Sequence, residues 1–132
     1  MGALGWGAKI PYEILEALKE AIQSIEVRNW KSCVVMCRRA LQSLMEFAYE
    51  NLFGTKAKGL DLNGVIRKFE TLTPPRIPKH WLNIADAVRN VGNVPGAHPR
   101  AISGCKFTKQ DAQLAYDNTS AFVTAYFEKI AP

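Results

Sequence analysis

Apolar residues recur every three or four positions along almost the whole chain, and this spacing restricts the possible folds more than any other feature. Residues at that spacing share one face of an α-helix, whereas a half-buried strand carries apolar residues at alternate positions. No segment of the 132-residue sequence shows convincing strand alternation. We therefore predict an all-α fold, a single helical bundle of about five helices that packs its apolar faces into one core.

Start and stop signals divide this pattern into five segments. Pro11 is suited to a first helical turn and Asn29 to a helix cap. Thr108 and Asp111 have the spacing of a capping box, and Gly54 is suited to a helix end. The second segment has the widest apolar arc, which indicates the central helix. The predicted helices cover about residues 11–27, 29–52, 61–72, 78–91 and 109–130.

The length and composition fit one ordinary globular domain. Hydrophobic residues make up 48% of the sequence and charged residues 22%, close to the average for folded proteins. We predict one helical domain over residues 11–132. We interpret the glycine-rich residues 1–10 as a disordered tail or an addition made for expression.

Cysteine usage and the lack of long apolar runs indicate a cytoplasmic protein without a membrane partner. Cys33 and Cys37 lie four positions apart on a predicted helix, which suits two buried thiols better than a disulfide bridge. No apolar run approaches the roughly 18 residues of a membrane-spanning helix. The first residues also lack the basic start and apolar stretch of a signal peptide.

The sequence carries no familiar metal-binding or nucleotide-binding motif. Two histidines and three scattered cysteines do not form a zinc-ligand set. No Gly-x-Gly-x-x-Gly stretch, Walker loop or Gly-x-Ser-x-Gly elbow is present. We therefore predict neither a metal nor a cofactor.

The stretch RNVGNVPGAH, residues 89–98, ends a predicted helix and carries polar residues suited to RNA chemistry. An arginine fork holds a phosphate, a histidine transfers protons near neutral pH, and an asparagine orients either group. Arg89, Asn90 and His98 are therefore candidate catalytic residues for metal-independent RNA cleavage. The structural alternative is that Arg89 and Asn90 bond the open carbonyls of the helix end while His98 docks the loop.

Other basic residues extend the possible nucleic-acid surface. Arg38 and Arg39 lie on the central helix, where pairing with a carboxylate competes with phosphate contact as their role. The net charge of +5 and the basic loops of the second half would suit a phosphate backbone, with Trp81 or Phe107 as a stacking surface. The candidate nucleic-acid-binding residues are Arg38, Arg39, Asn93, Arg100 and Lys106.

Five stretches of the sequence carry a family resemblance: PYEILEALKEAI, WKSCVVMCRRALQSLMEFA, DLNGVIRKFE, IPKHWLNIADAVRNVGNVPGAH and TKQDAQLAYD. They are similar to the bacterial domain-of-unknown-function family four-one-four-five, which is placed in the HEPN superfamily, and span about residues 11–130. The resemblance implies an HEPN-like helical bundle, occurrence alone or fused to restriction and defence proteins, and frequent dimerisation.

The resemblance also implies a role for the corner at residues 89–98. HEPN ribonucleases carry an arginine, a polar neighbour and a histidine four to six residues further on, paired across a dimer. Arg89, Asn90 and His98 match these types in order, but eight residues separate Arg89 from His98, and Gly92 and Pro95 interrupt the helix between them. Cleavage and binding without cleavage therefore both stay open.

Two functional hypotheses follow from the sequence, and a third stays open. The first is an HEPN-like, nucleic-acid-associated module of bacterial defence or restriction type that binds RNA or cleaves it without metal. The second is a non-catalytic domain for protein interaction or dimerisation, whose partner is a second copy or another protein. The third is a small-molecule pocket inside the bundle, lined by Trp30, Met36 and Phe47.

Overall fold

The computed structural model describes residues 10–92 and 107–131, and helices dominate both parts. The all-α prediction is confirmed, and no strand occurs in these two ranges. A short π-helix, η2, continues directly from the last α-helix. The elements are α2 (Tyr12–Glu26), α3 (Trp30–Phe53), α4 (Leu62–Glu70), α5 (Lys79–Gly92), α6 (Lys109–Ala125) and η2 (Tyr126–Ile130).

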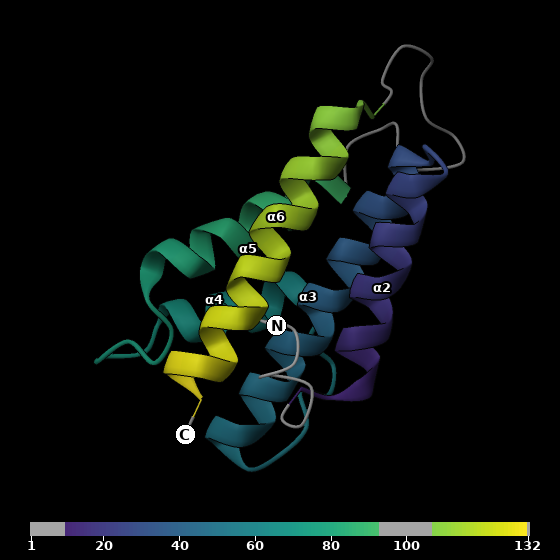
Figure 1. Ribbon diagram of the computed structural model, residues 1–132. Coiled ribbons are helices and arrows are strands. Elements are labelled where there is room, and N and C mark those ends of the chain that lie inside the picture. The colour runs from purple at the N-terminus through teal and green to yellow at the C-terminus, as the bar shows by residue number, and fades with distance from the viewer. Residues whose placement is uncertain (1–9, 93–106, 132) are drawn as a thin grey trace.

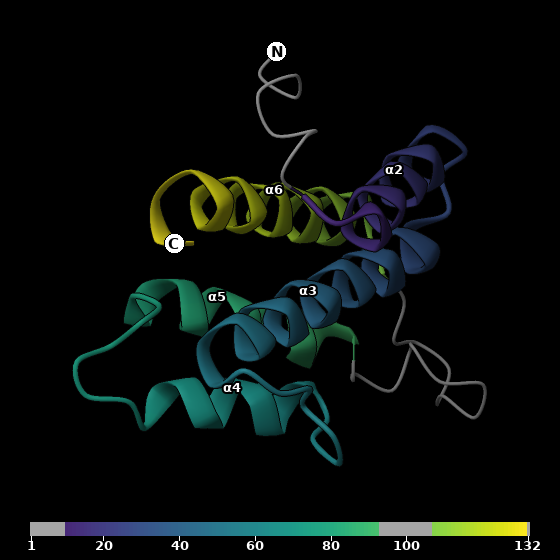
Figure 2. The same cartoon turned by 90° about the horizontal axis from the view of Figure 1, so that it is seen from below.

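The long helix α3 organises the bundle, as its wide apolar arc predicts. It lies between α2 and α6 on one side and α4 and α5 on the other (Figure 2). Each of those four helices packs against α3, and α5 also contacts α6 (Figure 1). The side chains that fill the space between them include Ile14, Leu41, Leu44, Met45, Ile66 and Phe122, all fully buried.

Local chemistry at the helix ends explains why the predicted boundaries agree closely with the observed ones. The Asn29 side chain accepts a hydrogen bond from the Ser32 amide, which satisfies a free N–H of the first turn of α3. Gly54 ends α3 with φ of 73°, a left-handed conformation that glycine adopts without a Cβ clash. Thr108 and Asp111 form the predicted capping box at the start of α6.

Two sequence predictions about apolar residues are wrong. Helical spacing predicts Leu114 in the core, but this residue is 63% exposed, because α6 turns its alanines, including Ala112, toward α3. Close packing explains this choice, since the Cys33 sulfur lies 3.6 Å from the Ala112 carbonyl oxygen. Helical spacing also predicts Ile22 of α2 in the core, and it is likewise 41% exposed.

Candidate functional site

Arg89 lies in the last turn of α5 and is held by an acidic residue of the same helix. Its Nε donates a hydrogen bond to Oδ1 of Asp86 at 3.1 Å, and one terminal nitrogen lies 3.0 Å from the same oxygen. The spacing of three residues places both side chains on one face of the helix. The Arg89 side chain is 17% exposed, so the guanidinium is fixed in position at the bundle edge.

A second arginine shares the Asp86 carboxylate and joins two helices. Arg67 of α4 lies 3.3 Å from both oxygens of Asp86 and also pairs with Glu70 of its own helix. We call Arg67, Glu70, Asp86 and Arg89 the Asp86 cluster. The cluster contains two cations and two anions, so its net charge is close to zero. Its contact between Arg67 and Asp86 joins α4 to α5.

The cluster lowers the pKa of Asp86 below its ordinary value. Burial alone would raise this pKa, but hydrogen bonds from Arg89 and Arg67 outweigh burial and favour the carboxylate. A carboxyl with a lowered pKa in the folded state stabilises the protein above its unfolded pKa, and this stability disappears as the pH falls through the folded pKa.

Replacing Asp86 with asparagine is therefore expected to destabilise the protein in a pH-dependent way. At pH 7 the free energy of unfolding should fall by about 0.5–1 kcal/mol, the range of partly exposed ion pairs. As the pH falls below about 4 and through the lowered pKa of Asp86, the difference should shrink, because the wild-type carboxyl then loses its charge. Urea unfolding at several pH values measures this difference, with the exposed Glu26→Gln as control. A loss that stays constant with pH would contradict the ion-pair explanation.

The described residues contain only part of the predicted RNA corner. Asn90 follows Arg89 directly and is exposed, so the two polar groups lie together at the end of α5. Arg89 bonds Asp86 rather than the helix-end carbonyls that the structural alternative predicts. The remaining candidates lie outside the described residues, and their predicted roles stay predictions. These are Asn93, His98, Arg100 and Lys106.

Arg38 and Arg39 occupy different surroundings on α3. Arg39 is exposed, whereas Arg38 is half-buried and its Nε has no hydrogen-bond partner among the described residues. Neither arginine forms an ion pair with a carboxylate in residues 10–92 or 107–131, so the expected pairing is not found there. Because this Nε is itself buried, it does not offer a donor to a phosphate at the surface, and phosphate contact by Arg38 and Arg39 stays a prediction.

The predicted stacking surface is partly used by the fold itself. The Trp81 ring stacks on Phe122 of α6, with centroids 5.4 Å apart and planes at 15°. Phe107 is half-buried and packs against the core. One face of Trp81 is therefore covered by the bundle.

The sequence interpretation missed Asp86, although its spacing to Arg89 was visible. An acid and an arginine three positions apart on a predicted helix form a recognisable pair. Arg67 could not be found in this way, because only the packing of α4 on α5 brings it to Asp86. The cluster therefore combines one local and one tertiary contact.

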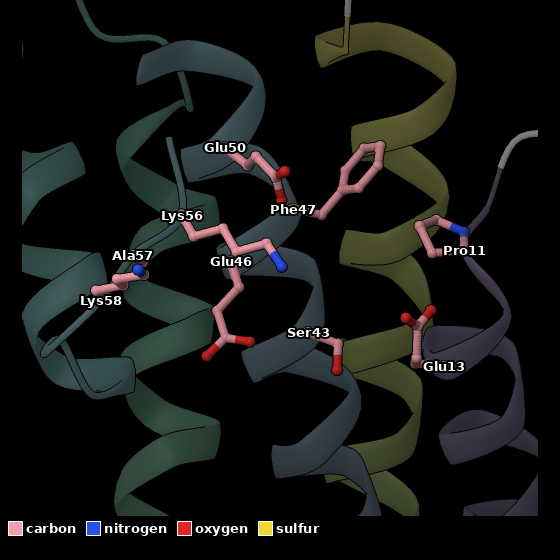
Figure 3. A pocket seen from close by; sticks show the side chains of 9 residues that line it. All are labelled: Pro11, Glu13, Ser43, Glu46, Phe47, Glu50, Lys56, Ala57 and Lys58. Carbon is pink, nitrogen blue, oxygen red and sulfur yellow. The ribbon is translucent and has the colours of Figure 1, made fainter. Parts of the chain in front are cut away.

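The structure also contains a surface hollow that the sequence did not indicate. It has a volume of about 390 Å³ and lies between the start of α2, the face of α3 and the loop that follows α3 (Figure 3). Lys56 extends across the part of α3 that carries Glu46 and Glu50. Phe47 lines this hollow, whereas Met36 lines a different one, so the predicted interior pocket with Trp30 is not assembled from these residues.

Two further sequence predictions concern cysteines and metals. Cys33 and Cys37 are buried free thiols, as predicted. Within the described part of the chain, no group of three or more histidine, cysteine or acidic residues is placed to hold a metal ion. None of the helices in that part is both long and apolar enough to cross a membrane.

Comparison with known proteins gives one match. Residues 19–130, most of the chain, match the model of a family described as Domain of unknown function (DUF4145). No significant match was found among curated proteins or among solved structures.

Proposed function

The chain belongs to the DUF4145 family, and from that premise we propose that it is an HEPN-like module that binds RNA in bacterial defence or restriction. The observation that carries the proposal is the fixed position of Arg89 at the end of α5, with Asn90 beside it. Asp86 accepts a hydrogen bond from Nε of Arg89 and lies 3.0 Å from one terminal nitrogen. The other terminal nitrogen has no partner within residues 10–92 and 107–131 and would suit a phosphate oxygen. The segment with Asn93 and His98 begins directly after this turn.

Cleavage is the stronger form of the proposal and needs His98 as well as Arg89. The histidine would take the proton of a ribose 2′-hydroxyl or protonate the leaving oxygen. Arg89 would stabilise the negative charge that builds on the phosphate. Such a reaction needs no metal ion, so it should proceed in EDTA.

The test measures binding and cleavage of one mixed-sequence single-stranded RNA. Fluorescence anisotropy in about 50 mM salt reports binding, and a denaturing gel of the same samples in EDTA reports cleavage. We expect Arg89→Gln to weaken binding about tenfold, as the loss of one well-placed phosphate contact does. Lys19→Gln removes one exposed charge from α2 and should change binding less than twofold.

The possible results separate the forms of the proposal. Cleavage in EDTA that both Arg89→Gln and His98→Ala abolish, in variants with unchanged circular dichroism, would establish a ribonuclease. Binding without cleavage would establish an RNA-binding module. RNA that stays unbound by the wild-type protein at low salt would contradict both forms.

A protein-interaction or dimerisation domain is the second candidate, and exposed apolar residues where α2 meets α3 favour it. Val27 is 74% exposed and lines a hollow of about 300 Å³ together with Met36. Val35 is also exposed. Exposed apolar groups of this kind often mark contact surfaces. This second candidate would be supported if the wild-type protein does not bind RNA and elutes from a size-exclusion column as a dimer, while the Val27→Lys variant elutes as a monomer.

A further inference from the structure

A small cavity lies at the end of the bundle opposite the start of α6. Its volume is about 150 Å³, and its walls come from α3, α4, the segment before α5 and η2. The pocket opens to solvent and most of its wall is apolar, so an apolar ligand group is better suited to it than water. The apolar lining consists of Ala48, Leu52, Phe69, Ile77 and Ile130.

The π-helix η2 shapes one wall of this cavity. The Ala131 amide donates a 2.7 Å hydrogen bond to the carbonyl oxygen of Tyr126, five residues earlier. The wider turn lets both Tyr126 and Ile130 line the cavity. The sequence predicts an ordinary α-helix here. π-Turns are rare in proteins as a whole, and those that occur are often found at functional sites.

Three polar residues complete the lining. Tyr126 is only 3% exposed, and burial raises the pKa of its phenol, although a hydrogen bond with Asn51 opposes this rise. The phenol is therefore neutral at physiological pH and can donate its O–H. Arg76 is exposed at the cavity edge and forms no ion pair within residues 10–92 or 107–131.

The size and the polar groups together define a ligand class. A cavity of about 150 Å³ lined by aliphatic and aromatic side chains holds a benzene ring, and a nucleotide is far too large for it. An arginine at the edge selects a planar carboxylate, which its fork binds through two hydrogen bonds. We propose that this cavity binds a small monocarboxylate with a ring-sized apolar body, of which benzoate is the simplest probe.

In this arrangement the ring contacts Leu52, Phe69 and Ile130, while the carboxylate meets Arg76 and the Tyr126 hydroxyl. Arg89 and the Asp86 cluster take no part, because none of their residues lines the cavity. Binding here is therefore independent of RNA binding, and either proposal can fail without the other.

The experiment is a benzoate titration of the full chain followed by amide chemical shifts in NMR, with benzamide as the neutral analogue. We expect saturable shifts centred on Ala48, Phe69 and Ile77, with a Kd of about 1 mM for a ligand of this size. Arg76→Gln should weaken benzoate binding about tenfold and leave benzamide binding unchanged. Lys68→Gln, a matched loss of an exposed charge on α4, should change neither.

Two further variants change the hydroxyl and the volume of the cavity separately. Tyr126→Phe keeps the ring and should weaken benzoate binding severalfold, and Ile130→Trp should fill the cavity and abolish it. Shifts that do not saturate, shifts away from the cavity, or unchanged binding by Ile130→Trp would overturn the site. Equal weakening of benzoate and benzamide by Arg76→Gln would overturn the assignment of a carboxylate ligand.

Discussion

Replacing Phe122 with alanine should lower the free energy of unfolding by about 3–5 kcal/mol, which is a large share of the stability of a small domain. Phe122 is completely buried in α6 and stacks on Trp81 of α5. Alanine would leave a void that the surrounding helices fill only in part, so both burial and dispersion contacts are lost.

Urea unfolding followed by far-ultraviolet circular dichroism measures this loss without relying on the fluorescence of Trp81. The matched control is Leu114→Ala on the same helix, where the leucine is 63% exposed and the expected change is within about 0.5 kcal/mol. Equal effects of the two substitutions would mean that α6 does not pack through the face that carries Phe122.

Cys33 and Cys37 should react with a thiol reagent at least about a thousandfold more slowly in the folded protein than in urea. Both side chains are 0% exposed. A hydrogen bond with Cys33, together with burial, raises the pKa of the Cys37 thiol above its ordinary value. The thiolate is the reactive form, so both burial and ionisation oppose labelling of Cys37. A hydrogen bond with Cys37 lowers the pKa of the Cys33 thiol, so only burial protects Cys33.

Iodoacetamide labelling followed by peptide mass spectrometry measures the two rates separately. The Cys105→Ser variant removes the third thiol, so that the signal comes from Cys33 and Cys37 alone. A free cysteine peptide labelled in parallel gives the unprotected rate. Labelling of either residue at the peptide rate would show that α3 and α6 separate readily.

The helix boundaries could be predicted because the signals are local. Asn29, Gly54 and Thr108 each act on backbone groups within a few residues, so the sequence contains the whole interaction. Which residues are buried could not be predicted in the same way. The sequence alone does not decide between Leu114 and Ala112 as the core residue, because the answer depends on the distance between α6 and α3. Ala112 is buried and Leu114 exposed because the close packing of the two helices favours the smaller side chain.

The candidate site was predictable to a lesser degree for the same reason. Arg89 and Asn90 could be selected from their position at a helix end, and Asp86 from its spacing to Arg89. Arg67 meets Asp86 only through the packing of α4 on α5, and only the folded chain brings Arg76 to the edge of the small cavity. The π-turn at Tyr126 has no sequence signal that we can identify.

The contact between α3 and α6 also has a kinetic consequence. The Cys33 sulfur and the Ala112 carbonyl oxygen meet across 79 positions of sequence, whereas α2 and α3 are joined by a short turn. Closing a long loop costs entropy before the contact is made, so the α2–α3 hairpin can form first and α6 adds late. A late-docking helix stabilises the native state more than the transition state for folding, so weakening it mainly speeds unfolding. The lifetime of the folded protein therefore depends on the contact between α6 and α3.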